Sequence, residues 1–321
     1  MTRWMKMMAV AVVVAVTGAK AIAASHVDSN LPTYQTQSGV SGNLNSIGSD
    51  TLNNLMTFWA EEFKKTYPNV NIQIEGKGSS TAPPALIEGT AQLGPMSRKM
   101  KNEERKKFFI KHGCFPVEVP VAIDALAVYV NKDNPIKALT LEQVDAIFST
   151  TRKRGGQEAK TWGDLGLTGD WANKPISKYG RNSASGTYGF FKEHVLMNGD
   201  YAGDVKEQPG SASVVQGVEK DLGGIGYSGI GYKTPGVRAV PIIAKEGGSP
   251  VEADYQNAVS FKYPIARYLY VYAHRPKGAA MPPLVHEFFM FVLSKQGQIV
   301  VEKDGYFPMT DKQLKDFRGV L

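Results

Sequence analysis

The order of apolar and polar residues predicts that strands and helices alternate along most of the chain. The first predicted helix has five apolar residues at helical spacing, namely Leu52, Leu55, Met56, Trp59 and Phe63. It is expected to end near Tyr67-Pro68, because proline cannot continue a helix. In residues 70–75 apolar and polar side chains then alternate, which predicts a half-buried strand.

The same patterns recur to the end of the chain. They predict further helices over residues 81–88, 101–111, 141–147, 188–196 and 284–293, of which the last is the final helix. They predict strands over residues 117–130, near residue 176, over residues 224–227 and over residues 265–272. Strands that alternate with helices are typical of an α/β fold with mostly parallel sheets.

Residues 1–24 have the pattern of a secretory signal peptide. Arg3 and Lys6 give a positive start, residues 7–16 are an unbroken apolar run, and Ala21 and Ala23 form an A-x-A cleavage site. The run is too short to span a bilayer, which argues against a transmembrane anchor. We therefore expect cleavage and a soluble protein in the periplasm. Residues 25–42 are polar and lack apolar periodicity, so we expect a flexible N-terminal segment there.

Composition and charge narrow the classes of function. The 321 residues are 42% hydrophobic and 21% charged, as in a packed globular protein. The formal charge of +7 suggests an anionic partner, but loss of Arg3, Lys6 and Lys20 with the signal peptide lowers it by three, to +4. In an exported protein this modest excess does not argue for nucleic acid. Cys114 is the only cysteine, which excludes an intramolecular disulfide, and the histidines lack the spacing of a zinc site.

Small hydroxyl residues and glycine stand at the predicted start of three helices. These segments run from Gly48 to Thr51, from Gly78 to Thr81 and from Ser185 to Thr187. The first turn of a helix has unpaired N–H groups and a partial positive charge, so such residues either cap the helix or help to bind an anion. Arg181, four residues before Ser185, adds a planar charged fork that suits a tetrahedral oxyanion. The combination favours an anion site, with helix capping as the alternative.

The sequence from Arg181 to Thr187, R-x-x-x-S-G-T, is similar to the phosphate-binding segment of the periplasmic phosphate-binding proteins that serve ABC transporters. Residues 47–51, 75–80 and 92–98 resemble that family's other anion loops, and the similarity runs from about residue 41 to near the C-terminus. The resemblance implies two α/β lobes joined by two crossovers, with the ligand in the cleft between them. It implies ligand contacts for seven residues: Thr51, Leu52, Ser79, Arg181, Ser185, Gly186 and Thr187.

Ser97 departs from the pattern of this family, because many members have an aspartate there that accepts the proton of bound hydrogen phosphate. Asp124 interrupts an apolar predicted strand, and a buried carboxylate needs a partner. We expect Asp124 either to be the substitute proton acceptor or to pair with a backbone group or Arg98. Asp50 is the next candidate for the acceptor. The predicted site therefore includes Ser97 and Asp124, with Asp50, Ser80 and Arg98 as a second tier.

The sequence thus predicts an α/β protein of the two-lobed periplasmic binding type (type II-like). Lobe I is expected to hold residues 43–125 and 268–321, and lobe II residues 126–267, with the crossovers in the strands over residues 122–130 and 265–272. We expect a monomer that binds inorganic phosphate and delivers it to the membrane subunits of an ABC transporter. We expect no enzymatic activity, cofactor, metal, nucleic acid or membrane insertion after signal cleavage. The alternatives are a receptor for sulfate, molybdate or arsenate, a secreted phosphatase, and a surface or adhesion protein.

Overall fold

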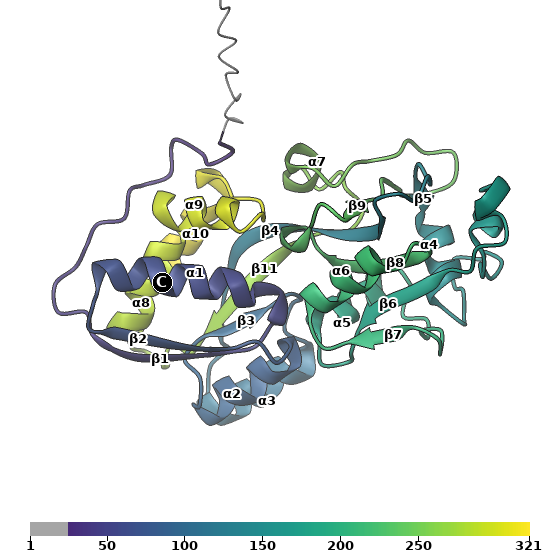
Figure 1. Cartoon of the computed structure of the whole chain (residues 1–321). Helices are drawn as coiled ribbons and strands as arrows, with labels where there is room; N and C mark the ends of the chain where they lie inside the picture. The colour runs from purple at the N-terminus through teal and green to yellow at the C-terminus, as the bar shows by residue number, and fades with distance from the viewer. Residues whose placement is uncertain (1–24) are drawn as a thin grey trace, which may run out of the picture.

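The structure is a computed structural model that describes residues 25–321 of the chain. Its helices and strands form two lobes that lie side by side and are joined by two long strands (Figure 1). These strands are β4 (Val117–Asn131) and β11 (Ala266–Ala273). The predicted signal peptide lies outside the described residues. Within residues 25–321, none of the helices is long and apolar enough to cross a membrane.

Lobe I packs helices against a small group of strands. The strands are β1 (Gly42–Ile47), β2 (Val70–Glu75) and β3 (Gly94–Met96). The helices are α1 (Asn53–Thr66), α2 (Ala82–Glu88), α3 (Asn102–His112), α8 (Pro283–Val292), α9 (Lys295–Lys303) and α10 (Asp311–Val320). Strands β1 and β2 pair in parallel, so their carboxyl ends lie at the same edge. The apolar residues whose spacing predicted α1 form its buried face. This face packs toward α8 and α9.

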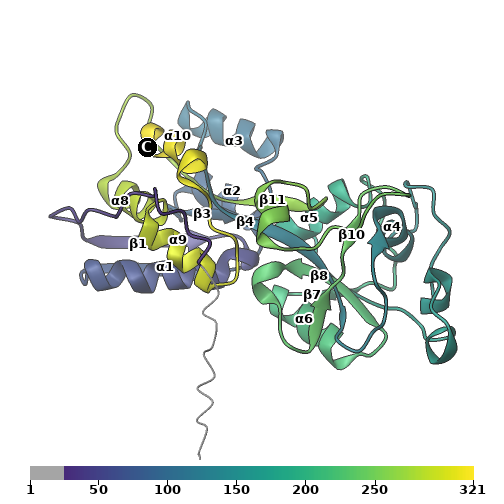
Figure 2. The same cartoon turned by 90° about the horizontal axis from the view of Figure 1, so that it is seen from above.

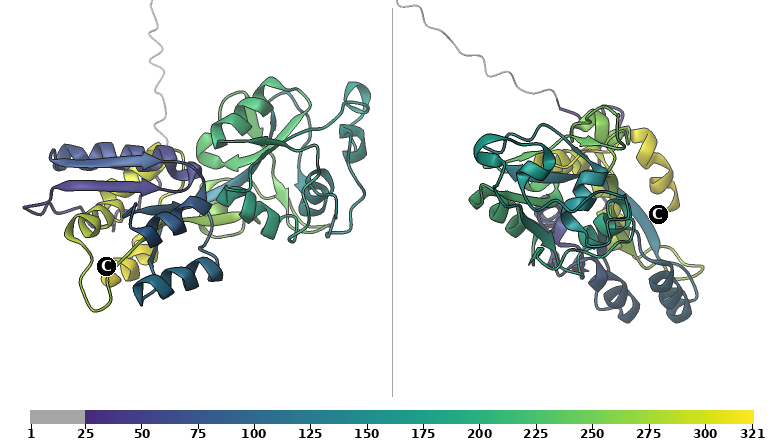
Figure 3. Two further views of the ribbon diagram at one scale, coloured as in Figure 1. Left: turned by 90° about the horizontal axis from the view of Figure 1, so that it is seen from below. Right: turned by 90° about the vertical axis from the view of Figure 1, so that its right-hand side faces the viewer.

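Lobe II is built from the middle part of the chain. Its strands are β5 (Leu139–Thr140), β6 (Ser177–Arg181), β7 (Lys206–Gln208), β8 (Gly224–Gly229), β9 (Val237–Ala239) and β10 (Ile242–Ile243). Its helices are α4 (Leu141–Phe148), α5 (Gly186–His194) and α6 (Ser211–Lys220). The short helix α7 (Tyr255–Val259) lies against the linking strands β4 and β11. The views from above and from below show the same two lobes (Figures 2 and 3).

One seven-stranded sheet crosses both lobes, and β4 is its common strand. The order is β3-β11-β4-β8-β6-β7, and β9 also pairs with β4. Residues Val117–Ala125 of β4 pair with β11, whereas Leu126–Asn131 pair with β8 and β9. The exchange of partners at Ala125 and Leu126 agrees with the predicted crossover. The prediction of mostly parallel sheets is wrong for this sheet, because β4 runs antiparallel to β11, β8 and β9.

The N-terminal segment is not the free flexible lead that its polar composition predicted. It has no helix or strand before β1, but it is packed along α8 and α9 (Figure 2). Leu31 is 3% exposed, the Tyr34 hydroxyl donates to Glu287 at 2.7 Å, and the Lys295 N–H donates to the Pro32 carbonyl at 2.9 Å. The apolar contacts of a few side chains therefore hold a segment that is polar on average.

The final helix is also wrongly predicted. The expected helix over residues 284–293 is α8, but α9 and α10 follow it. Helix α10 has Leu314 and Phe317 at helical spacing, with Leu314 buried and Phe317 packed against the core, a short amphipathic pattern that the sequence analysis missed. Helix α5 begins at Gly186, two residues before the predicted start, because Ser185 caps it.

Candidate functional site

Four hydroxyl groups from the two lobes meet between β3 and α5. The Thr51 Oγ1 lies 2.9 Å from the Thr187 Oγ1, and the Ser79 Oγ lies 3.2 Å from the Ser97 Oγ. The Ser97 Oγ is also 3.5 Å from the Thr187 Oγ1. All four side chains are buried. We call these four residues the hydroxyl cluster; the structure thus brings together candidates that stand up to 136 positions apart in the chain.

The topology explains why the lobe I members are neighbours. Thr51 follows β1, Ser79 follows β2 and Ser97 follows β3. β1 pairs in parallel with β2, and Ser46 of β1 forms a parallel bridge to Leu93 just before β3. The carboxyl ends of parallel strands meet at one edge, which is where ligands bind in open α/β sheets.

Helix α5 carries the lobe II side of the site. The Ser185 Oγ accepts the Thr187 N–H at 3.1 Å and the Tyr188 N–H at 3.4 Å, so the capping alternative applies to this serine. It does not apply to Thr51 or Ser79, whose hydroxyl groups contact other members of the cluster. Helix capping and the anion site are therefore compatible, because Ser185 accepts N–H groups as a cap and still has its own proton to donate.

Gly186 is the residue that lets the lobes approach each other. A Cβ atom at this position would lie 2.2 Å from the Ser79 Oγ and 2.6 Å from the Ser97 Oγ. Both distances are far below an ordinary contact, so any side chain here would separate α5 from lobe I. The backbone N–H of Gly186, at the first turn of α5, lies next to the hydroxyl cluster as a consequence.

Arg181 ends β6 and is 2% exposed. Its Nη1 lies 2.7 Å from the Ser211 Oγ and 3.1 Å from the Asp50 Oδ2, and its Nη2 donates to the Pro209 carbonyl at 3.1 Å. The Arg181 Nε is buried with no partner within residues 25–321. Burial lowers the pKa of Arg181, and the Asp50 carboxylate acts in the opposite direction. An arginine stays charged in a protein, so the site holds a fixed positive group.

Asp50 contacts the opposite lobe. Its Oδ2 accepts both the N–H and the hydroxyl of Ser211 at 2.8 Å, at the start of α6. Its backbone carbonyl accepts the Tyr232 hydroxyl at 2.9 Å. With the ion pair to Arg181, these contacts make Asp50 a clasp between lobe I and lobe II.

Asp124 pairs with an arginine that the sequence analysis missed. Its Oδ2 accepts the Arg267 Nε–H at 2.9 Å, and its Oδ1 accepts the Ile230 N–H at 2.9 Å. Arg267 also donates from Nη1 to the Ser97 carbonyl at 2.8 Å and from Nη2 to the Thr187 Oγ1 at 3.0 Å. Asp124 is therefore paired, as one of the two alternatives predicted. Its partners are a backbone N–H group, as predicted, and Arg267 in place of Arg98. Whether Asp124 also accepts a ligand proton stays a prediction.

The second-tier residues Ser80 and Arg98 lie beside the cluster. Arg98 forms two bonds with the Glu104 carboxylate, at 2.7 and 2.8 Å, and reaches the Ser80 Oγ at 3.3 Å. The Ser80 N–H donates to the Ala184 carbonyl of lobe II at 3.1 Å. Leu52 is fully buried, and its N–H donates to the Ser49 carbonyl at 3.3 Å. These residues fix the loops that present the hydroxyl cluster.

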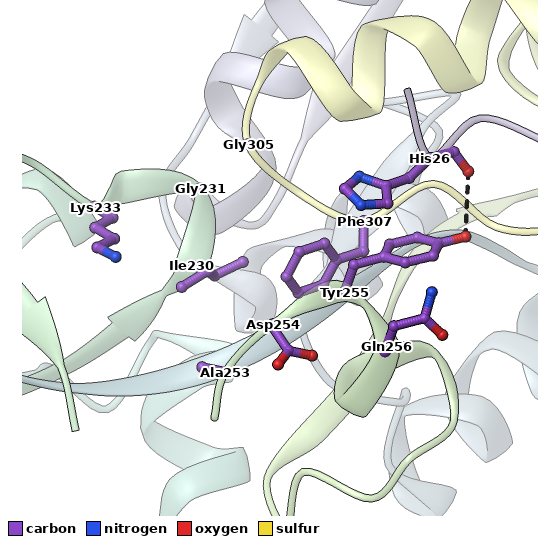
Figure 4. Close-up of a pocket in the computed structure, with 10 residues that line it drawn as sticks. All are labelled: His26, Ile230, Gly231, Lys233, Ala253, Asp254, Tyr255, Gln256, Gly305 and Phe307. Carbon is purple, nitrogen blue, oxygen red and sulfur yellow. Dashed lines mark hydrogen bonds between the residues drawn. The ribbon is translucent and has the colours of Figure 1, made fainter. Parts of the chain in front are cut away.

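A separate cavity of about 530 Å³ lies where α7 meets the C-terminal part of lobe I (Figure 4). Tyr255, Phe307 and Ile230 line it, and the His26 ring stacks on Tyr255 with 4.2 Å between the ring centroids. The predicted site residues do not line this cavity. Over residues 25–321, there is no group of three or more His, Cys, Asp and Glu side chains that could hold a metal ion.

Two α/β lobes that meet at buried hydroxyls, a helix start and an arginine are the mark of a periplasmic-type binding protein for a small anion. A family model described as a PBP superfamily domain matches residues 33–296. The phosphate-binding protein PstS of Pseudomonas aeruginosa is 60% identical over 308 residues, which cover 96% of this chain and 95% of that protein. Protein SphX of Synechococcus elongatus is 31% identical over 272 residues, or 83% of this chain and 77% of that protein.

Solved structures with a similar fold are also phosphate-binding proteins. A putative phosphate ABC transporter substrate-binding protein with bound phosphate, from Clostridium perfringens, has a TM-score of 0.70 and 28% identity, over 84% of this chain and 100% of that one. An ABC-type phosphate transport receptor from Vibrio cholerae, with a TM-score of 0.64 and 20% identity over 82% and 99% of the two chains, supports the fold alone. This chain belongs to the PBP superfamily and, within it, to the PstS family of phosphate-binding proteins. The predicted family and the predicted two-lobed α/β fold are therefore confirmed.

Proposed function

We propose that this protein binds inorganic phosphate between its lobes and delivers it to the membrane subunits of an ABC transporter. One observation carries the proposal: buried hydroxyl groups of both lobes converge on the start of α5, beside Arg181, in a chain that is 60% identical to a PstS. Donors from both lobes suit a ligand that closes the cleft. Closure excludes water, which strengthens charge-assisted hydrogen bonds to the anion.

The predicted ligand residues divide by the kind of donor that they offer. Hydroxyl groups come from Thr51, Ser79, Ser97, Ser185 and Thr187. The Gly186 backbone N–H and the Arg181 Nε–H, which has no partner within residues 25–321, are further donors. The Leu52 N–H would leave the Ser49 carbonyl, which it contacts at 3.3 Å, to join them. Phosphate has four oxygens, each able to accept several hydrogen bonds, so one small anion can engage donors from both lobes at once.

The lobe boundaries and the cellular setting are part of the proposal. We place residues 43–125 and 268–321 in lobe I and residues 126–267 in lobe II, which the exchange of β4 partners at Ala125 and Leu126 supports. Export by a cleaved signal peptide would put the receptor in the periplasm, as a monomer that does not insert into the membrane. There it would carry phosphate to its transporter.

The relatives are binding proteins, and within residues 25–321 none of the four hydroxyls of the cluster is hydrogen-bonded to a carboxylate or a histidine. Receptors for other tetrahedral oxyanions are the second candidate function, because Ser97 stands where the family resemblance implies an aspartate. A neutral hydroxyl does not repel sulfate, which carries no proton at neutral pH, as strongly as a carboxylate would.

Titration calorimetry on the purified secreted protein, from which the signal peptide has been cleaved, tests the proposal. Phosphate, sulfate, molybdate and arsenate are titrated separately at pH 6 and pH 8. We expect one phosphate per chain and weaker binding of sulfate. Absence of heat with phosphate would overturn the proposal, and heat with sulfate in its place would establish the second candidate. Release of phosphate from a chromogenic phosphate ester would reveal a phosphatase.

A further inference from the structure

We infer that Arg267 is a second arginine of the anion site and acts as a positioning residue. It makes the Thr187 hydroxyl a donor toward the ligand, and Asp124 holds it in place. The inference rests on the proposed function and deepens it. It gives Asp124 a task other than accepting a ligand proton.

The position of Arg267 follows from the antiparallel register of the two linking strands. Arg267 of β11 lies directly opposite Asp124 of β4, where the chain passes between the lobes. Arg267 is 3% exposed and Asp124 is fully buried, so a missing partner would leave a buried charge unpaired. The guanidinium also stacks over the Phe190 ring, with 5.2 Å between its carbon and the ring centroid. Asp124 and the Phe190 ring therefore both fix the orientation of the Arg267 guanidinium.

The contacts of Arg267 reach both lobes. Its Nε and Nη2 lie 2.9 and 2.8 Å from the Asp124 Oδ2. Nη1 donates to the Ser97 carbonyl of lobe I at 2.8 Å, and Nη2 donates to the Thr187 Oγ1 of lobe II at 3.0 Å. One side chain thus connects the loop after β3 to the first turn of α5. Arg267 can hold this arrangement only when the lobes are close together.

The direction of the Thr187 hydroxyl follows from counting donors and acceptors. A hydroxyl has one proton to donate and two lone pairs, and a guanidinium can only donate. Thr187 must therefore accept from Arg267, and its own proton points elsewhere; the nearest hydroxyl oxygen is that of Thr51 at 2.9 Å. Ser79 is committed in the same way, because its Oγ accepts the Ser97 N–H at 3.0 Å. Fixed N–H groups thus turn these hydroxyls into donors, as an oxyanion requires.

The two remaining hydroxyls of the cluster are not committed. Among the hydrogen bonds of the described chain, Thr51 and Ser97 contact only other hydroxyl groups through their side chains. Either can accept a hydrogen bond from the P–O–H group of hydrogen phosphate and donate its own proton in a hydrogen bond elsewhere. Asp124 is not needed for that hydrogen bond, and N–H groups of Ile230 and Arg267 already donate to both of its oxygens, which leaves fewer lone pairs for a ligand.

Calorimetry on Arg267→Gln, Thr187→Val and the double variant tests the inference. A charge-assisted hydrogen bond is the interaction removed, so we expect each single variant to bind phosphate about 10- to 100-fold more weakly. Because Arg267 acts through Thr187, the double variant should bind within about threefold of the weaker single variant. Losses that multiply, or an Arg267→Gln protein that binds as tightly as the wild type, would overturn the inference.

Two further variants and the wild type itself serve as controls for this experiment. Arg267→Gln combined with Asp124→Asn replaces the buried ion pair by neutral amides and should fold even where the single variant does not; it should show the same weakened binding. Arg238→Gln is the matched control, since Arg238 is also an internal arginine that donates to carbonyls, of Asn134 and Ile136, in lobe II. It should bind phosphate normally. Failure of the wild type to bind phosphate would refute the proposed function, not the role of Arg267.

The ratio of phosphate to sulfate affinity separates the two roles of Asp124. If Asp124 anchors Arg267, Asp124→Asn should weaken both anions similarly and leave the ratio and its pH dependence near those of the wild type. If Asp124 accepts the ligand proton, the ratio should fall sharply in this variant alone, and the anchoring role would be wrong.

Discussion

Gly186→Ala should abolish tight binding of phosphate without unfolding either lobe. The new Cβ would lie 2.2 Å from the Ser79 Oγ, 2.6 Å from the Ser97 Oγ and 2.8 Å from the Ser79 Cβ. Rotation of a hydroxyl could relieve the first two contacts, but not the third, since the Ser79 Cβ is fixed to the backbone. In the variant, helix α5 and the Ser79 loop therefore cannot approach each other as closely as they do in the wild type.

The size of the effect follows from these distances. The contact with the Ser79 Cβ, which no rotation relieves, must lengthen from 2.8 Å to an ordinary contact of 3.4 Å, a displacement of about 0.6 Å. A shift of this size breaks or badly misaligns hydrogen bonds that have narrow limits of distance. Loss of two charge-assisted bonds, at about 1.5 to 3 kcal/mol each, is about 3 to 6 kcal/mol. We therefore expect phosphate affinity to fall by at least about 100-fold.

The matched control is Gly189→Ala, one turn further along α5. There the nearest atom to a new Cβ is the Arg98 Cδ at 3.5 Å, an ordinary contact. Both substitutions exchange glycine for alanine in the same helix, which by propensity alone stabilises it by up to about 1 kcal/mol. Calorimetry should find normal binding for Gly189→Ala, and thermal unfolding should find no loss of stability for either variant. A Gly186→Ala protein that binds phosphate within threefold of the wild type would refute the close approach of α5 to Ser79.

Three other changes test separate parts of the structure. Asp50→Ala removes the contacts with Ser211 and Arg181 that join the lobes, so phosphate should dissociate about tenfold faster or more in stopped-flow displacement; a rate within twofold would contradict the clasp. Burial raises the pKa of Asp304 to about 7, so the folded protein holds this proton more tightly than the unfolded chain and loses stability as pH rises from about 4 to about 7. Asp304→Asn should therefore raise Tm at pH 8 and leave it unchanged at pH 4, and equal shifts at both would refute the burial effect. Leu31→Ala should lower the stability by about 2 kcal/mol in denaturant unfolding, whereas a free N-terminal segment would show no change.

Most helices and strands could be predicted because their apolar residues repeat with a clear period. Helix α1 and strand β2 begin and end close to the predicted residues, and both have one buried face. Where burial depends on a few contacts between distant parts of the chain, the period is short or absent. Helix α10 repeats only through Leu314 and Phe317, and the N-terminal segment is held by contacts such as that of Tyr34 with Glu287. Composition alone predicted flexibility for that segment, because it averages over the few residues that bind.

The hydroxyl residues of the site could be found for a similar reason: each stands at a chemically distinctive point of the sequence. Thr51, Ser79 and Ser185 each precede a predicted helix, Ser79 and Ser185 also follow a predicted strand, and the strand order brings their loops together. Which of them caps a helix and which faces the ligand cannot be read from this pattern. Only the contacts show that Ser185 accepts N–H groups of its own helix, while Thr51 reaches across to lobe II.

The pairing of Arg267 with Asp124 could not be predicted from the pattern of a single strand. Asp124 in an apolar strand signalled a buried carboxylate in need of a partner, and Arg267 in another apolar strand signalled the same need with opposite charge. The two are 143 positions apart, and only the antiparallel register of β4 and β11 pairs them. A buried charge in a predicted strand is thus best matched first to a buried opposite charge in another predicted strand, because neither can be desolvated alone. Applied here, that rule selects Arg267 over Arg98, which follows β3 and pairs with the nearby Glu104. The linking strands therefore place a buried ion pair against the hydroxyl cluster as well as joining the two lobes.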